Sequence, residues 1–271
     1  MAAFVPDVAF VTTVRPSPNH GERRGGPPDM IVLHYTGMAS ADEALAKLCD
    51  GEPTDGHRVS AHYFIGEDGR LVQCVPEARR AWHAGVSSWE GKHDVNSRSI
   101  GIEIANPGHD FGYPDFPEAQ IAAVIALCRD ILLRHRLRPD RVVAHSDVAP
   151  ARKRDPGERF PWRLLSDEGI GLWVAPAEIT AGPSLQAGDR GAAIAELQAN
   201  LAAYGYGIEA TGRFDSASRD VVAAFQRHFR PALIDGRADS STVDTLRRLL
   251  AARQRMIDNR LGKPPSSQAI P

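Results

Sequence analysis

The first 165 residues contain two kinds of hydrophobic pattern, short apolar runs and apolar residues at helical spacing. Short runs bounded by turn residues are typical of buried strands, and apolar residues three or four positions apart indicate helices with one buried face. The runs cover 30–35, 59–65, 70–75, 99–105 and 142–144, and the helical spacings cover 40–50 and a long segment opened by Pro117. The pattern predicts an α/β domain with a mixed central β-sheet flanked by helices.

Two details refine this prediction. The dipeptide Asp68-Gly69 lies between two of the runs and is a strong hairpin signal, so 59–65 and 70–75 should pair antiparallel. Residues 77–98 show neither pattern and are expected to be irregular. An irregular stretch of that length inside a compact domain usually has a function.

The pattern changes after residue 165. Residues 166–183 are rich in glycine and proline and predict a linker. Three segments with apolar residues at helical spacing follow, which predict a small all-α three-helix domain over 184–252. The polar, proline-containing tail 253–271 is expected to be loose. The first domain then spans 1–165, including a lead-in over 1–28.

Composition limits the classes of function. The chain has 271 residues with 42% hydrophobic and 24% charged content, and a net charge of -2. These values are ordinary for a soluble globular protein and give no bulk attraction to nucleic acid. The three cysteines form no CxxC motif and are expected to be free thiols.

No apolar run approaches the length of a membrane span. The N-terminus has no basic region before its apolar residues, so we do not interpret it as a signal peptide. The sequence as it stands therefore predicts a cytoplasmic protein, with the periplasm or cell envelope as the alternative. It gives no oligomeric state.

Two histidines and one aspartate are candidate metal ligands. His34 lies near the end of the run 30–35, and His145 directly follows 142–144. Asp155 lies in the proline-rich loop that follows His145. Two histidines and a carboxylate suit zinc, which takes nitrogen and oxygen donors and leaves a fourth position open in catalytic sites. The two histidines can meet only if their strands are neighbours, and a surface turn with solvated charges is the alternative for the loop.

Glu103 is the one acid within the run 99–105, whose other residues are apolar on both faces. A buried carboxylate without a partner costs several kcal/mol. We therefore favour a functional carboxylate over a salt bridge at the end of a strand.

Four segments resemble the AmpD/AmiD family of zinc-dependent N-acetylmuramoyl-L-alanine amidases. They are IVLHYT (31–36), VSAHYFIGEDGRLVQCVPEARRAWHAG (59–85), SIGIEIAN (99–106) and AHSDVAPARKRDPGERFPW (144–162). That family is related in fold to phage lysozyme-like amidases and animal peptidoglycan recognition proteins. The resemblance implies a mixed sheet with helices around it and a groove over a metal ion.

The resemblance also implies roles for individual residues. The zinc ligands fall on His34, His145 and Asp155, and the catalytic carboxylate falls on Glu103. The family's loop lysine falls on Lys153, where it would stabilise the oxyanion.

Four further residues are expected to contact substrate. Trp82 and His83 would line the groove, although a buried core position is equally expected for Trp82. His62 and Tyr63 are adjacent on a strand, so only one of them faces the site, and Tyr63 is taken as a substrate contact. Asn106 follows the strand that carries the catalytic carboxylate and is expected to contact peptide.

The second domain resembles the three-helix peptidoglycan-binding module. The matching segments are GDRGAAIAELQANLAAYGY (188–206), GRFDSASRDVVAAFQ (212–226) and DGRADSSTVDTLRRLL (235–250). Ser218 stands where that module usually has threonine, so retained glycan affinity is less secure than the helical core.

Together the two resemblances imply an enzyme with Zn²⁺ as cofactor and peptidoglycan or a muropeptide as its partner. It would hydrolyse the amide bond between N-acetylmuramic acid, or its anhydro form, and L-alanine of the stem peptide. The alternative is a non-catalytic peptidoglycan-recognition protein, which the complete ligand set disfavours. A generic zinc protease is disfavoured because the sequence contains no HExxH motif.

Overall fold

The computed structural model describes residues 4–261, and the chain divides into two compact units between Gly171 and Leu172. This division falls inside the segment 166–183 that was predicted as a linker. Among residues 4–261, no helix combines the length and the apolar character that crossing a membrane requires.

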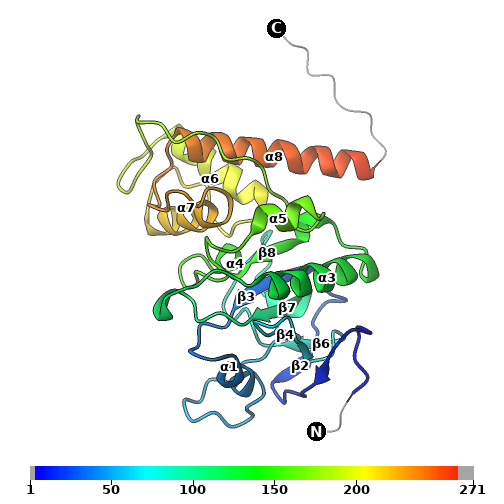
Figure 1. Cartoon of the computed structure of the whole chain (residues 1–271). Helices are drawn as coiled ribbons and strands as arrows, with labels where there is room; N and C mark the ends of the chain where they lie inside the picture. Colours follow the sequence, from blue (N-terminus) through cyan, green and yellow to red (C-terminus); the bar gives the residue numbers. More distant parts are fainter. Residues whose placement is uncertain (1–3, 262–271) are drawn as a thin grey trace. The chain divides into compact units, whose positions relative to one another are not determined.

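The first unit is built on a six-stranded sheet with the order β1-β5-β4-β7-β3-β8. Strands β4, β7, β3 and β8 of this sheet are labelled in Figure 1. The strands are β1 Thr13–Val14, β3 Met30–Tyr35, β4 Tyr63–Ile65, β5 Leu71–Gln73, β7 Ser99–Ile104 and β8 Val142–Ala144. Strands β4, β7, β3 and β8 are mutually parallel, while β5 runs antiparallel to β4 after the Asp68-Gly69 turn. The predicted mixed sheet and its hairpin are therefore confirmed.

Helices pack around this sheet, and the longer ones bury apolar residues at helical spacing. The first unit contains α1 Ala41–Leu48, α2 Val95–Arg98, α3 Glu118–Arg134, α4 His145–Val148 and α5 Trp162–Asp167, with 3₁₀ turns η1 His109–Phe111 and η2 Pro139–Arg141. The hydroxyl of Ser40 accepts the backbone N–H of Glu43 and caps α1. Pro117 precedes α3, whose buried residues recur at helical spacing as predicted.

Two segments differ from the sequence pattern. Only Tyr63–Ile65 of the predicted strand 59–65 is a strand. The segment 77–98 is not wholly irregular, because it contains β6 Arg79–Ala81 and the short helix α2. Strand β6 pairs antiparallel with β2 His20–Glu22, a segment without any apolar alternation, so sequence pattern could not reveal the pair.

Over residues 172–261, the second unit contains three helices, α6 Ala192–Tyr204, α7 Ser216–Phe229 and α8 Ser240–Arg260. Their core contains Ile194, Leu197, Leu201, Tyr204, Val221, Val222, Phe225, Phe229, Leu246 and Leu249. The prediction of a loose tail is wrong for 253–260, which continue α8. Arg253 explains part of this continuation, because its Nη1 donates to the carbonyls of Ala203 and Tyr204 at the end of α6. The rest of the tail, 262–271, lies outside the described residues.

Candidate metal centre and active site

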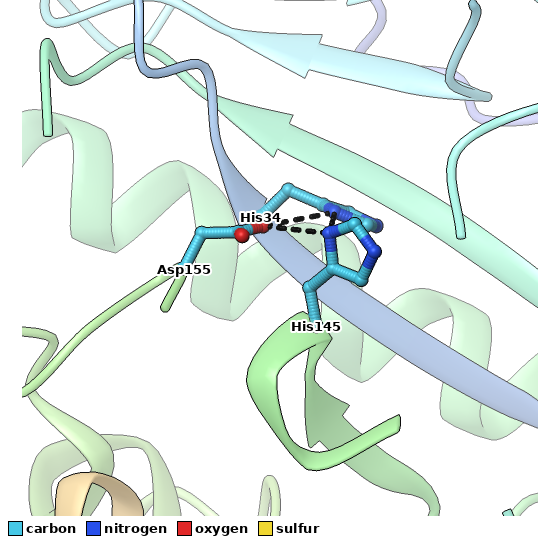
Figure 2. A group of neighbouring side chains, drawn as sticks. All are labelled: His34, His145 and Asp155. Atoms are coloured by element: carbon cyan, nitrogen blue, oxygen red, sulfur yellow. Dashed lines mark hydrogen bonds and ion pairs between the residues drawn. The ribbon is translucent and has the colours of Figure 1, made fainter. Parts of the chain in front are cut away.

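The topology of the sheet brings the three candidate ligands together. Strand β3 lies between β7 and β8, and all three are parallel, so their carboxyl ends reach the same edge. Leu33 on β3 pairs with Ala144 on β8, which places His145, the first residue of α4, beside His34. Asp155 approaches both from the loop after α4 (Figure 2). The condition that the two histidine-bearing strands be neighbours is met.

The three side chains direct one donor atom each toward a common point. The Nδ1 atoms of His34 and His145 are 2.8 Å apart, and Oδ2 of Asp155 lies 3.1 Å and 2.9 Å from them (Figure 2). All three residues are buried. Donors of a tetrahedral zinc ion with bonds of about 2.1 Å lie roughly 3.4 Å apart, so small adjustments suffice for this set to hold one ion. These residues form the candidate metal centre of the described chain.

The electrostatics of the set also suit a metal ion. Burial, with the neighbouring His145, lowers the pKa of His34 to about 4, although Asp155 opposes this. Burial alone would raise the pKa of Asp155, but the charge and hydrogen bonds of the two histidines hold it well below its usual value. His34 is therefore neutral and Asp155 ionised at neutral pH, which are the forms in which these side chains bind metals.

Glu103 lies directly beside this centre. It pairs in register with His34 across β7 and β3, and paired residues of adjacent strands share one face of the sheet. Its Oε2 atom is buried and has no hydrogen-bond partner within the described residues. Burial and the charge of Asp155 raise the pKa of Glu103 well above its ordinary value, and Lys153 partly opposes them. A buried carboxyl oxygen without a partner requires a functional explanation.

A cavity of about 340 Å³ opens over these residues. Glu103, His145, Lys153 and Asp155 line it, as the sequence predicted for a common site. Sequence reasoning missed several other lining residues, including Tyr35, Lys47, Asp110, Arg152 and Arg154. Tyr35 directly follows His34, and the two arginines flank Lys153, so proximity to the motifs was the one available signal for these three.

Of the residues predicted to contact substrate, His83 lines the cavity, whereas Trp82 and Asn106 do not. His83 lines the cavity, but its Nδ1 lies 3.0 Å from Nε2 of His34, so its ring is engaged by a ligand residue. Trp82 is not among the residues lining the cavity. Asn106 is buried, and its amide donates to the carbonyl of Pro114 and accepts the N–H of Gly108. It therefore organises the loop after β7 and is not placed to meet a substrate.

The prediction for Tyr63 is wrong. Tyr63 pairs in register with Ile102, whereas its neighbour Phe64 pairs with Glu103. Successive residues of a strand face opposite sides, so Tyr63 lies on the face away from the metal centre. There it is fully buried, and its hydroxyl donates to Oε1 of Glu77 at 2.6 Å.

Two known sequence families match the chain. A family described as N-acetylmuramoyl-L-alanine amidase matches residues 24–158. A family described as putative peptidoglycan binding domain matches residues 190–246. The two matches fall in the first and second compact units, respectively.

Individual relatives extend over most of the chain. The N-acetylmuramoyl-L-alanine amidase AmiD of Escherichia coli K12 is 39% identical over 225 residues, which cover 79% of this chain and 79% of that protein. The structure of E. coli AmiD with the substrate anhydro-N-acetylmuramic acid-L-Ala-D-γ-Glu-L-Lys has a TM-score of 0.69 and 36% identity, covering 85% of this chain and 92% of that one. The structure of AmpDH3 from Pseudomonas aeruginosa with anhydromuramic pentapeptide has a TM-score of 0.69 and 32% identity, covering 89% and 96%.

Proposed function

Because this chain belongs to the N-acetylmuramoyl-L-alanine amidase family, we propose that it hydrolyses the amide bond between N-acetylmuramic acid, or its anhydro form, and L-alanine of the stem peptide. The zinc that this reaction uses would be held by His34, His145 and Asp155. The observation that carries the proposal is the convergence of three donor atoms, from distant segments, beside the unpartnered carboxyl oxygen of Glu103. A recognition protein without catalysis has no use for that combination.

Glu103 is assigned the proton transfers. When bound, zinc supplies a Lewis acid that activates water near neutral pH and polarises a carbonyl group. Its positive charge would also oppose the burial that raises the pKa of Glu103, and so favour the carboxylate form. Glu103 then accepts the proton of the attacking water and passes it to the leaving nitrogen of L-alanine.

Lys153 is assigned the stabilisation of negative charge. It lies in the wall of the cavity, two residues before Asp155. Attack on the amide carbonyl creates an oxyanion, and Lys153 lines the cavity in which that charge develops. One such electrostatic contact is typically worth about 3–4 kcal/mol.

The substrate would be the intact wall, soluble muropeptides or both. The AmiD and AmpDH3 structures are complexes with anhydromuramic peptides, which favours fragments with an anhydro end. The match to a peptidoglycan-binding domain favours attachment to the wall. Action on the wall would place the protein in the cell envelope, whereas the cytoplasmic location stays a prediction from the sequence.

The test is product analysis on purified sacculi and on a purified anhydro-muropeptide, with and without a chelator. We expect release of stem peptides with a free L-alanine amino group, loss of that release on chelation, and recovery with added zinc. Comparing the two substrates also decides between the wall and soluble fragments.

Glu103→Gln provides the matched variant, because it keeps the shape of the side chain and removes its basicity. We expect this variant to retain its zinc, measured by metal analysis, and to lose about 10²–10⁴-fold in turnover. Wild-type protein that carries zinc and cleaves neither substrate would instead favour the recognition protein.

A further inference from the structure

A chain of hydrogen bonds leads away from the metal centre and ends at a backbone carbonyl. The hydroxyl of Ser99 lies 2.6 Å from the carbonyl oxygen of Val95. A carbonyl can only accept, so Ser99 donates its one proton to it. The Ser99 oxygen must then accept from Nε2 of His83, which lies 3.1 Å away. Nε2 of His83 therefore carries a proton.

This proton assignment propagates to a metal ligand. In a neutral imidazole one nitrogen donates and the other accepts, so Nδ1 of His83 is an acceptor. Its partner at 3.0 Å is Nε2 of His34, which must donate. The proton of His34 is thereby held on Nε2, and the lone pair of its Nδ1 points toward His145 and Asp155.

Ala84, the residue after His83, fixes the tautomer of the second histidine ligand, His145. Nε2 of His145 lies 3.2 Å from the carbonyl oxygen of Ala84 and donates to it, which leaves Nδ1 of His145 without a proton. His83 thus contacts Nε2 of His34, and the carbonyl of Ala84 contacts Nε2 of His145. The two Nδ1 atoms that they leave free are the pair 2.8 Å apart at the metal centre.

The surrounding structure holds this arrangement in place. Oδ1 of Asn96 accepts the backbone N–H groups of His83 at 3.1 Å and of Ala84 at 2.8 Å. Gly101 on β7 makes room for the ring, because a Cβ at that position would lie 2.4 Å from Cγ of His83. A strand interior is a poor place for glycine unless another group approaches closely, and here the His83 ring does.

We infer that His83 is a positioning residue for the metal centre and not a substrate contact. Through the chain His34–His83–Ser99–Val95, it fixes the tautomer and ring orientation of His34 so that Nδ1 faces the ion. This inference rests on the metal-binding part of the proposed function, and it concerns which atom binds and how tightly. Outer partners of metal-bound histidines typically contribute about 10–100-fold in metal affinity.

The experiment measures zinc affinity of the full-length protein by competition with a chromophoric chelator. His83→Phe keeps a ring and removes both hydrogen bonds, and we expect it to bind zinc about 10–100-fold more weakly. His83→Asn offers Oδ1 as an acceptor near the position of Nδ1 and should recover much of the loss. His93→Phe makes the same change at an exposed position and should leave the affinity unchanged.

Ser99→Ala is the second variant, because it removes the acceptor without altering either ring, and it should weaken zinc binding in a protein with wild-type circular dichroism. Nitrogen-15 NMR of the zinc-loaded wild type should show a proton on Nε2 of His34. Wild-type affinity in folded His83→Phe, or zinc on Nε2 of His34, would overturn the inference while the amidase proposal stands. A wild-type protein that binds no zinc would overturn both.

Discussion

Lys153 and Glu103 line the same cavity, and Lys153 acts electrostatically on Glu103. Lys153 lowers the pKa of Glu103 against the larger effects of burial and Asp155. It is not one of the three candidate metal ligands. Its contribution to turnover can therefore be separated from metal binding.

For Lys153→Ala we expect turnover to fall about 10²–10³-fold, because one contact to the developing oxyanion is lost. Zinc content should stay at the wild-type level. Steady-state kinetics on an anhydro-muropeptide, with metal analysis of the same preparation, measure both quantities. Lys153→Arg keeps the charge and should retain more activity than the alanine variant. Undiminished kcat in Lys153→Ala would remove this residue from the mechanism.

At the scale of single residues, the clustering of the three candidate metal ligands could be predicted, whereas the positions of Tyr63 and His83 could not. His34 lies near the end of one apolar run and His145 follows another, and the edge of a parallel sheet brings such positions together. The face on which Tyr63 lies depends on the register between β4 and β7. Pairing between distant segments fixes that register. The role of His83 likewise depends on Ser99, 16 positions away, and on the space at Gly101.

At the scale of elements, the loops of the second unit are built around buried glutamines. In α6, the amide of Gln198 donates to the carbonyl of Arg213 and the hydroxyl of Ser218 and accepts the N–H of Gly212. Ser218 also donates to Asp215, the cap of α7. A serine thus makes the contacts at a position where the module usually has threonine.

Gln226 in α7 repeats this arrangement in the next loop. Its amide donates to the carbonyl of Arg237 and the hydroxyl of Thr242, and it accepts the N–H groups of Asp235 and Gly236. The residue order Gly-Arg-x-Asp-x-x-Ser/Thr follows each glutamine, at 212–218 and at 236–242. Helical spacing predicted the three helices. It could not reveal that Gln198 and Gln226 bind the backbone of the following loops, because these contacts leave no periodic pattern in the sequence.

Gln226→Leu should destabilise the second unit by about 2–3 kcal/mol, because it leaves buried backbone groups without partners. Denaturant unfolding of the full-length protein, followed by circular dichroism at helical wavelengths, measures the change. Gln254→Leu is the control, since that glutamine is exposed on α8 and should change stability by less than about 0.5 kcal/mol. Equal stability of the two variants would contradict the structural role of Gln226.

At the scale of the whole molecule, the sequence predicted the class of each unit better than its connections. Apolar runs and helical spacings depend on neighbouring residues, so they identify a mixed sheet and a helical unit. The order β1-β5-β4-β7-β3-β8 depends on which distant strands pair, as does the pairing of β2 with β6. Contacts between distant segments also create a buried cluster around Glu77, which no local pattern indicates.

Glu77 joins three distant parts of the first unit on the side of the sheet opposite the metal centre. It is buried, and its carboxylate accepts two hydrogen bonds from Arg134, one from His135 and one from Tyr63. Burial alone would raise the pKa of Glu77, but these hydrogen bonds lower it to about 2. His135, the C-terminal cap of α3, is thus a partner of this carboxylate.

The lowered pKa of Glu77 makes the free energy of unfolding depend on pH. A carboxyl group with a lower pKa in the folded protein stabilises the fold above its unfolded pKa, and this contribution is lost as the pH falls through the folded pKa. For Glu77 the window runs from about 4.5 down to about 2, and the contribution at neutral pH is about 3 kcal/mol. The free energy of unfolding of the first unit should therefore fall over that window.

Glu77→Gln removes the titrating group, so the difference in unfolding free energy between wild type and variant should be greatest at pH 7 and narrow below about pH 4.5. Tryptophan fluorescence during denaturant unfolding reports mainly on the first unit, which contains three of the four tryptophans. Glu22→Gln is the control, because that carboxylate is 77% exposed beside Arg79 and should give a small, nearly constant difference. A constant difference for Glu77→Gln between pH 7 and pH 3 would mean that its ionisation does not stabilise the fold.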